Sequence, residues 1–228
     1  MKIKTFMAMM FAAFMFTACS SDDDGPEVDE KAEKEIVVSA EDYSVWNYVN
    51  LETGKITPVT AEGKWTFMKF EEGQKPEVVE EREPEKRIGE VPAKWHIAFH
   101  KYDARTNGGE VLLTQYKDLD EAVKAEFPEG SYIKDKKFEG KNAKIIVDMS
   151  GMMKGIIGYA GGYMNEELSK WVTKTPTHSM PPYKYEVPDA VFAVKFPDGS
   201  KALLEFDDYM DDNGKKCVEF EYIFFNKK

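Results

Sequence analysis

The 228-residue sequence contains only two cysteines and three histidines, and it lacks the short motifs of the common enzyme and metal sites. Two cysteines cannot form a framework of several disulfides. No Gly-x-Ser-x-Gly, His-Glu-x-x-His, Cys-x-x-Cys or phosphate-binding loop occurs. The 42 acidic residues offer many chance carboxylate pairs, but no spacing marks an acid/base couple. The sequence therefore predicts a protein that is not an enzyme, with a hydrolase built on two carboxylates as the weaker alternative.

Positive charge is also in short supply. Lysine and arginine number 31 against 42 aspartates and glutamates, which gives a formal net charge of −11. Proteins that bind nucleic acid neutralise phosphates with lysine and arginine. The charge balance therefore argues against a nucleic-acid partner and favours solubility at a wet surface.

The only long uncharged apolar run lies near the N-terminus, from Thr5 to Ala18. It is short for a membrane-spanning helix and follows two lysines, which is the layout of a secretory signal. The segment Phe16-Thr17-Ala18-Cys19 resembles a bacterial lipobox, so we expect residues 1–18 to be a lipoprotein signal peptide and Cys19 to carry the lipid. Residues 19–35 are acidic and lack aromatics, and they are expected to form a flexible tether. The remaining residues, 36–228, are expected to form one domain.

Short runs rich in valine, isoleucine and aromatic residues dominate this domain and predict a mainly β, antiparallel fold. Turn residues such as Asn107-Gly108-Gly109 separate them. Helical patterns are limited to Leu119–Phe127 and to Asn165–Val172, where Asn165 is suited to cap the helix. The charged stretch Glu71–Pro92 is expected to be an exposed loop or edge ribbon. The expected strands are Val45–Leu51, Lys64–Phe70, Trp95–His100, Glu110–Tyr116, Lys144–Asp148, Val191–Phe196, Lys201–Phe206 and Cys217–Phe225.

Two of the three histidines lie in the segment Trp95–His100. Alternation along a strand places His96, Ala98 and His100 on one face and the apolar residues on the other. Four residues along a strand span about 13 Å, so the two imidazoles are too far apart to share one ion. We therefore expect both histidines to pack within the fold.

The segment from Trp95 to Gly109, WHIAFHKYDARTNGG, is similar to the Trp-x-Ile-Ala-x-His-x-x-Asp-x-Arg-Thr-Asn-Gly-Gly segment of the HmuY family of haem-binding surface lipoproteins. The lipobox, the first strand at Ser44–Tyr48, the turn at Leu168–Trp171 and the strand at Phe220–Tyr222 agree with this resemblance. It implies a hand-like β fold in which two projecting segments grip haem b (iron protoporphyrin IX). It also implies an outer-membrane protein, exposed at the cell surface, that passes haem to a TonB-dependent receptor.

The sequence departs from the founding members of that family, in which two histidines hold the iron. The corresponding region here, from about Asp148 to Pro182, has one histidine, His178. Other members use two methionines, and the stretch MSGMMKGIIGYAGGYM at residues 149–164 supplies several. The resemblance therefore suggests Met153 and Met180 as axial ligands. Met152 in place of Met153 is an equal alternative, and Met149 and His178 are further alternatives.

A haem site also needs apolar faces and cations for the propionates. The aromatic residues near the proposed ligands are Tyr159, Tyr163, Trp171 and Tyr183, and the lysines are Lys154, Lys170, Lys174 and Lys184. The glycines of the methionine-rich stretch are expected to let the loop fold closely on a flat ligand. Host haemoproteins are a possible source of the haem, and shedding from the cell is left open. The alternative is a surface module of the same fold that binds a glycan or a peptide.

Overall fold

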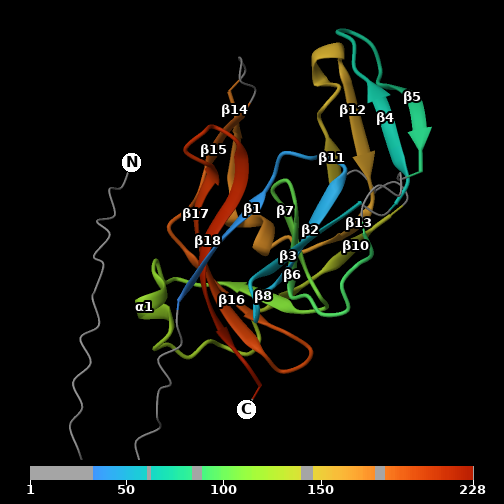
Figure 1. The fold of residues 1–228 in the computed structure, drawn as a ribbon. Coiled ribbons are helices and arrows are strands. Elements are labelled where there is room, and N and C mark those ends of the chain that lie inside the picture. Colours follow the sequence, from blue (N-terminus) through green and yellow to red (C-terminus); the bar gives the residue numbers. More distant parts are fainter. Residues whose placement is uncertain (1–32, 61–62, 84–88, 140–145, 178–182, 228) are drawn as a thin grey trace, which may run out of the picture. The chain divides into compact units, whose positions relative to one another are not determined.

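The computed structural model describes residues 33–60, 63–83, 89–139, 146–177 and 183–227. Within these residues, eighteen strands pair in antiparallel sheets, and helix is limited to one short α-helix and two 3-10 helices (Figure 1). This confirms the predicted fold class. Three residues of the sequence-based predictions, Cys19, His178 and Met180, lie outside the described residues, as do the predicted signal peptide and most of the tether.

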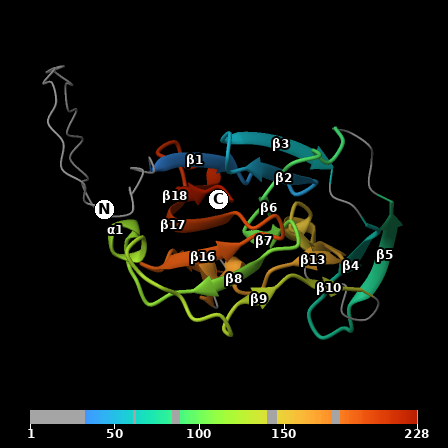
Figure 2. The same cartoon turned by 90° about the horizontal axis from the view of Figure 1, so that it is seen from below.

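The largest sheet has six strands in the order β1-β18-β17-β16-β8-β9, which Figure 2 shows from top to bottom. Its longest strands, β17 and β18, pair along most of their length, with a register shift after Phe206. Strand β1 begins at Lys34, so its first two residues fall within the range expected to be the tether. The bounds are β1 (Lys34–Ser39), β8 (Glu110–Leu113), β9 (Ile133–Lys134), β16 (Val191–Lys195), β17 (Lys201–Met210) and β18 (Lys216–Phe225).

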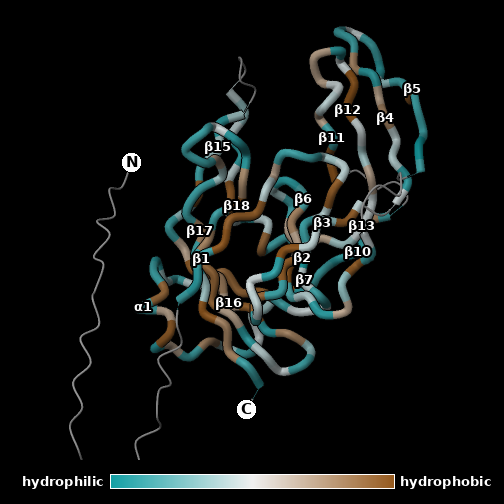
Figure 3. Tube along the Cα trace, viewed as in Figure 1, coloured by the Kyte–Doolittle hydropathy of each residue, from teal (hydrophilic) through white to brown (hydrophobic). Residues whose placement is uncertain are grey.

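A second sheet of four strands, in the order β3-β2-β6-β7, packs against the inner face of the first. Alternate residues of β6, Ile97 and Phe99, join Phe192, Phe206 and others of the large sheet in the main core. Figure 3 shows hydrophobic residues concentrated along β16 and β18, whereas β5 and β15 are mostly hydrophilic. The bounds are β2 (Val45–Asn50), β3 (Lys55–Thr60), β6 (Ile97–His100) and β7 (Asp103–Thr106).

The opposite face of this second sheet carries a separate, smaller core. Trp46, Tyr48 and Ala98 pack there against residues of a third sheet, which include Trp65 and Phe67. The third sheet has the order β11-β12-β4-β5, and β5 is an exposed edge strand, as expected for part of Glu71–Pro92. Its bounds are β4 (Trp65–Lys69), β5 (Glu77–Arg82), β11 (Ile146–Asp148) and β12 (Ile156–Ala160).

Two small ribbons and three short helices complete the described part of the chain. The 3-10 helix η3 is anchored by Asn165, whose Oδ1 accepts hydrogen bonds from the N–H groups of Glu167 and Leu168 at 3.1 and 2.9 Å. The bounds are β10 (Lys136–Phe138), β13 (Gly162–Met164), β14 (Thr173–Pro176), β15 (Tyr183–Glu186), α1 (Leu119–Ala122), η2 (Met152–Lys154) and η3 (Leu168–Trp171). Both predicted helices are therefore present but shorter than expected. None of the helices in the described residues has the length and hydrophobicity needed to cross a membrane.

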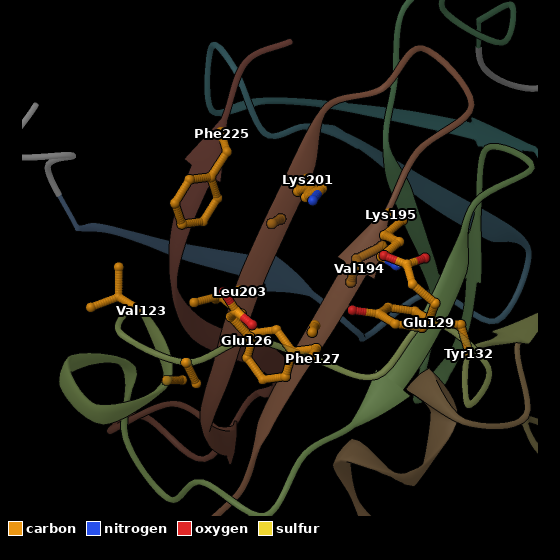
Figure 4. A pocket seen from close by; sticks show the side chains of 14 residues that line it. Val123, Glu126, Phe127, Glu129, Tyr132, Val194, Lys195, Lys201, Leu203 and Phe225 are labelled. Carbon is orange, nitrogen blue, oxygen red and sulfur yellow. The ribbon is translucent and has the colours of Figure 1, made fainter. Parts of the chain in front are cut away.

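The outer face of the large sheet is partly covered by α1 and the segment that follows it. A cavity of about 500 Å³ lies between them, with Phe127, Leu203 and Phe225 among its apolar walls (Figure 4). At its rim, Lys195 Nζ lies 2.7 Å from Glu129 Oε2 and 4.1 Å from the centre of the Tyr132 ring. The charges at this side of the rim are thus already paired within the protein.

His96 and His100 are buried, as expected, but the prediction that they share one face of a strand is wrong. Strand β6 begins at Ile97, and His96 lies in the bend before it, so the alternation does not extend to His96. His96 lies between the rings of Phe196 and Phe224, with centroids at 5.0 and 4.7 Å, on the side of the main core. His100 contacts Trp46 on the other side of the sheet. The two imidazoles are therefore separated by the sheet itself.

Acidic side chains lie directly opposite each other across β1, β18 and β17. Glu221 is paired in register with Glu35 on one side and Glu205 on the other. Like charges in such positions destabilise a sheet. Next to them, burial and a hydrogen bond to Glu221 raise the pKa of Glu33 to about 7, and Asp120 of α1 adds to the shift.

We expect the free energy of unfolding to fall as the pH rises from about 5 to 8. The folded state retains a proton on Glu33 that the unfolded state releases above its ordinary pKa of 4.5, so the stabilisation is complete below 4.5 and lost as the pH passes about 7. Glu221→Gln should flatten this dependence and raise stability at pH 8. Urea denaturation at several pH values measures it, and equal slopes in the variant and the wild type would contradict the prediction.

Candidate binding site

The methionine-rich stretch forms a β-hairpin, made of β11, η2 and β12. Strand β12 pairs with β11 on one side and with β4 on the other. The turn is closed by the hydrogen bond from Gly155 N to Met152 O at 2.9 Å, and Gly155 has a φ of +70° that favours glycine. Gly155 O then accepts from Phe70 N at 2.8 Å, which fixes the turn to the third sheet. The hairpin is thus held firmly from its base to its tip.

The three methionines before the turn's end differ sharply in exposure. Met149 and Met152 are half-buried, whereas the side chain of Met153 is 86% exposed. No other large hydrophobic residue of the described chain is as exposed, and the next is Val78 at 51%. A free thioether at the tip of a rigid hairpin is a soft ligand that meets no partner in the described part of the protein.

The glycines of the stretch have a structural role that the sequence did not reveal. A Cβ on Gly158 would lie 2.6 Å from the Phe67 ring, and one on Gly155 would lie 2.8 Å from Phe70 O. Both glycines therefore allow β12 and its turn to approach β4 closely. The expectation that they shape the loop around a ligand is not needed to explain them.

The second hairpin consists of β14 and β15, paired from Thr173 with Glu186 to Pro176 with Tyr183. Its connection includes residues 178–182, so Met180 and His178 belong to this hairpin but lie outside the described residues. Tyr183, at the start of β15, is 37% exposed. Figure 1 shows both hairpins extending from the sheets in the same direction.

Side chains of both hairpins act electrostatically on Tyr43, in the turn before β2. Burial raises the pKa of Tyr43 to about 12, and Tyr185 of β15 and Asp148 of β11 both add to the shift. Similarly, burial and the nearby Tyr183 raise the pKa of Tyr159. Tyr43 therefore lies within electrostatic range of both hairpins, and Tyr159 and Tyr183, the tyrosines proposed from the sequence, influence one another from separate hairpins.

A cavity of about 500 Å³ lies beside Tyr43, with Asp148 and Ser150 of the first hairpin and Arg82 of β5 in its walls. Two further cations approach Tyr43: Lys101 Nζ lies 3.8 Å from the centre of its ring and Lys216 Nζ 5.9 Å. Burial, and secondarily the charge of Lys216, lowers the pKa of Lys101 to about 8. Lys101 also has a φ of +54°, a left-handed conformation uncommon for a residue with a side chain. The walls of the cavity also include Glu41, Asp42 and Asp148, so this floor is aromatic and carries charges of both signs.

Other residues proposed from the sequence lie elsewhere or have partners. Trp171 is fully buried in the main core, where its Nε1 donates to Tyr102 O at 2.9 Å. Tyr163 is 48% exposed on β13 and lines a different cavity, described below. Lys170 and Lys184 form ion pairs with Glu167 and Glu186 at 2.5 and 2.6 Å. Lys154 and Lys174 are exposed.

Sequence reasoning missed the floor of the site. Tyr43, Lys101 and Lys216 come from three turns or strand ends that are far apart in the chain, and no local pattern marks them. Lys101 lies in the segment WHIAFHKYDARTNGG, but its position is one of those at which the family segment does not specify a residue. In the described residues, no group of three or more histidine, cysteine, aspartate or glutamate side chains is arranged to hold a metal ion.

Comparison with known proteins gives a consistent assignment. The family described as HmuY protein matches residues 42–222. The apo PinO structure from Porphyromonas gingivitis is 37% identical, with a TM-score of 0.73 over 86% of this chain and 99% of that one. The apo HmuY analog TFO of Tannerella forsythia is 31% identical, with a TM-score of 0.70 over 88% of this chain and 100% of that one.

A third structure, from Bacteroides vulgatus, is described as HmuY-like and heme binding. It is 32% identical, with a TM-score of 0.66 over 87% of this chain and 94% of that one. The search of curated proteins gives no match. The family match covers most of the chain, and three solved structures share its fold at more than 30% identity. The chain belongs to the HmuY family.

Proposed function

We propose that this protein binds haem between the hairpin β11–β12 and the hairpin β14–β15, with Met153 and Met180 as the axial ligands. The exposure of Met153 carries the proposal, because a thioether that is 86% exposed at a fixed turn has no packing role. Membership of the HmuY family and the similarity to a structure described as heme binding support it.

The residues present fit such a ligand. Bound haem supplies an iron with two axial positions, for which thioethers are suitable donors. Tyr159 and Tyr183 offer aromatic surface from the two hairpins, and Tyr43 offers it from the floor. Lys101, Lys216 and Arg82 lie on or beside that floor together with the carboxylates of Glu41, Asp42 and Asp148, so we assign the attraction of the haem carboxylates to the exposed Lys154 and Lys174.

Methionine ligation gives the proposed site a distinctive chemistry. Thioethers do not titrate near neutral pH, whereas histidine ligands gain a proton at mildly acidic pH. The soft sulfur also favours ferrous over ferric iron. We therefore expect tighter binding under reducing conditions and retention of haem at mildly acidic pH.

We further propose that the protein acts at the cell surface, attached through lipid on Cys19 to the outer membrane. There it would take haem from solution or from host haemoproteins and pass it to a TonB-dependent receptor, without catalysing a reaction. The leader, the lipobox-like segment and the acidic residues after it support this location. The alternative is a surface module that keeps the family fold and binds a glycan or a peptide instead.

The experiment that tests this function is an absorption spectrum of the purified protein mixed with haem, recorded with and without dithionite. We expect the Soret, α and β bands of low-spin, six-coordinate iron, most clearly in the reduced sample. The same bands should persist when the pH is lowered from 7 to about 5.5, since no ligand titrates in that range. An unchanged spectrum of free haem would overturn the proposal and favour the non-haem alternative.

A further inference from the structure

A third cavity lies over the segment that carries the family resemblance. Its volume is about 480 Å³, and its walls include Tyr48, Val91, Trp95 and Tyr163 together with the run Thr106–Gly109. Two cations, Arg105 and Lys134, and one carboxylate, Asp135, also line it. Aromatic walls with a few polar groups are typical of small-molecule sites.

Arg105 is the central feature of this cavity, because it is a buried cation that forms no ion pair with any carboxylate of the described residues. Arg105 is only 8% exposed. Its Cζ lies 4.3, 5.1 and 5.6 Å from the ring centres of Trp46, Tyr48 and Trp95. The Nη2 group donates to the Tyr48 hydroxyl, and the Nε group is buried with no acceptor. Buried charges in proteins are normally paired and fully hydrogen-bonded.

The one carboxylate nearby does not fill this role. Asp135 accepts hydrogen bonds from the N–H and Oγ1 of Thr106 at 2.9 and 2.8 Å, and from Asn165 Nδ2 at 3.0 Å. No ion pair joins Asp135, or any other carboxylate of the described residues, to Arg105. Burial raises the pKa of Asp135 above its ordinary value. The hydrogen bonds from Asn165 and Thr106 lower this pKa, and the charge of Arg105 lowers it least. Arg105 thus lines the cavity wall, and its buried Nε has no acceptor in the described residues.

We propose that this cavity binds a small aromatic carboxylate, whose carboxylate pairs with the guanidinium of Arg105. A guanidinium presents a planar fork of N–H donors that matches a carboxylate. The half-buried Trp95 and the exposed Tyr163 supply faces for a flat apolar body. Lys134 is already paired with Glu110 at 3.9 Å, so Arg105 is the one cation of the lining without an ion pair in the described residues, which favours a monoanion over a doubly charged phosphate.

The proposal is independent of haem binding, and its test uses the haem-free protein. Isothermal titration with 2-naphthoate is expected to show one site with a Kd on the order of 100 µM. The neutral isostere 2-naphthamide should bind at least about tenfold more weakly, because it cannot form the charge-assisted pair. Failure of 2-naphthoate to bind at millimolar concentration, or equal binding of the amide, would overturn the proposal.

Two variants locate the site. Arg105→Lys keeps the charge but loses the fork, and it should weaken 2-naphthoate at least about tenfold. Val91→Trp places a large ring at the cavity wall, where Val91 is 38% exposed, and it should have a similar effect without disturbing Arg105. The matched control is Val79→Trp on β5, since Val79 is 45% exposed and does not line the cavity.

The second variant keeps the test decisive if Arg105→Lys fails to fold, because Val91 lies at the surface. Unchanged affinity in Val91→Trp would show that 2-naphthoate binds elsewhere and that Arg105 is held only by its aromatic neighbours. An equal loss in Val79→Trp would likewise contradict the assignment, since that substitution does not touch the cavity.

Discussion

Replacing Met153 by alanine is expected to remove the six-coordinate bands of bound haem and to weaken binding at least about tenfold. Met153 is the one methionine of its hairpin whose thioether is open to solvent, while Met149 and Met152 are half-buried. Loss of one axial ligand leaves five-coordinate iron with a shifted Soret band. Absorption spectra and haem titrations of the oxidised and reduced protein measure both effects.

Met152→Ala is the matched control, because it removes the same side chain one residue away in η2. The haem bands of this variant should resemble those of the wild type. Met180→Ala, in the other hairpin, should reproduce the loss seen in Met153→Ala. If Met152→Ala lost the bands and Met153→Ala kept them, Met152 would be the ligand; unchanged bands in both hairpins' variants would exclude methionine ligation altogether.

Replacing Trp171 by alanine is expected to lower the free energy of unfolding by about 3–5 kcal/mol. The indole is fully buried, stacks on Phe206 with centroids 5.1 Å apart, and donates a hydrogen bond to Tyr102 O. Its removal leaves a large cavity in the main core and an unsatisfied carbonyl. Urea denaturation followed by circular dichroism measures the change.

The same residue separates a core role from a role in ligand binding. Trp171→Phe retains an aromatic ring, so it should cost less than Trp171→Ala and leave the folded protein able to bind haem with unchanged affinity. Trp95→Ala is a control for the size of the substitution, because Trp95 is only half-buried and should cost less. A loss of haem affinity in folded Trp171→Phe would contradict the placement of Trp171 in the core.

Part of the sheet structure was predictable because short apolar runs and the turn residues between them mark those strands locally. All eight expected strands are present, and the turn at Asn107-Gly108-Gly109 lies between two of them as expected. The strands that were not expected are β1, β3, β7, β9, β10, β12, β13, β14 and β15. Glycines interrupt the alternation of β12 and β13. Strand β12 exists because β4, some ninety residues earlier, offers it a partner, and such long-range pairing leaves no local signal.

The candidate site was predictable only in part, for a related reason. Composition pointed to the methionines of residues 149–164, but exposure, which distinguishes Met153 from Met152, depends on how the turn ends at Gly155. The sequence suggested that Trp171 faces the ligand, but its side chain is buried in the main core. Arg105 belongs to the most recognisable segment of the chain, but its burial and the missing acceptor for its Nε in the described residues become visible only in the folded structure.

The two hairpins that flank Tyr43 differ in mechanical support. β12 is an inner strand, with β11 on one side and β4 on the other, whereas β14 and β15 pair only with each other in the described chain. An isolated two-stranded ribbon is marginally stable by itself. We therefore expect the first hairpin to be rigid and the second to be more flexible. The entropic cost of ordering the site around a ligand would then fall mainly on the second hairpin.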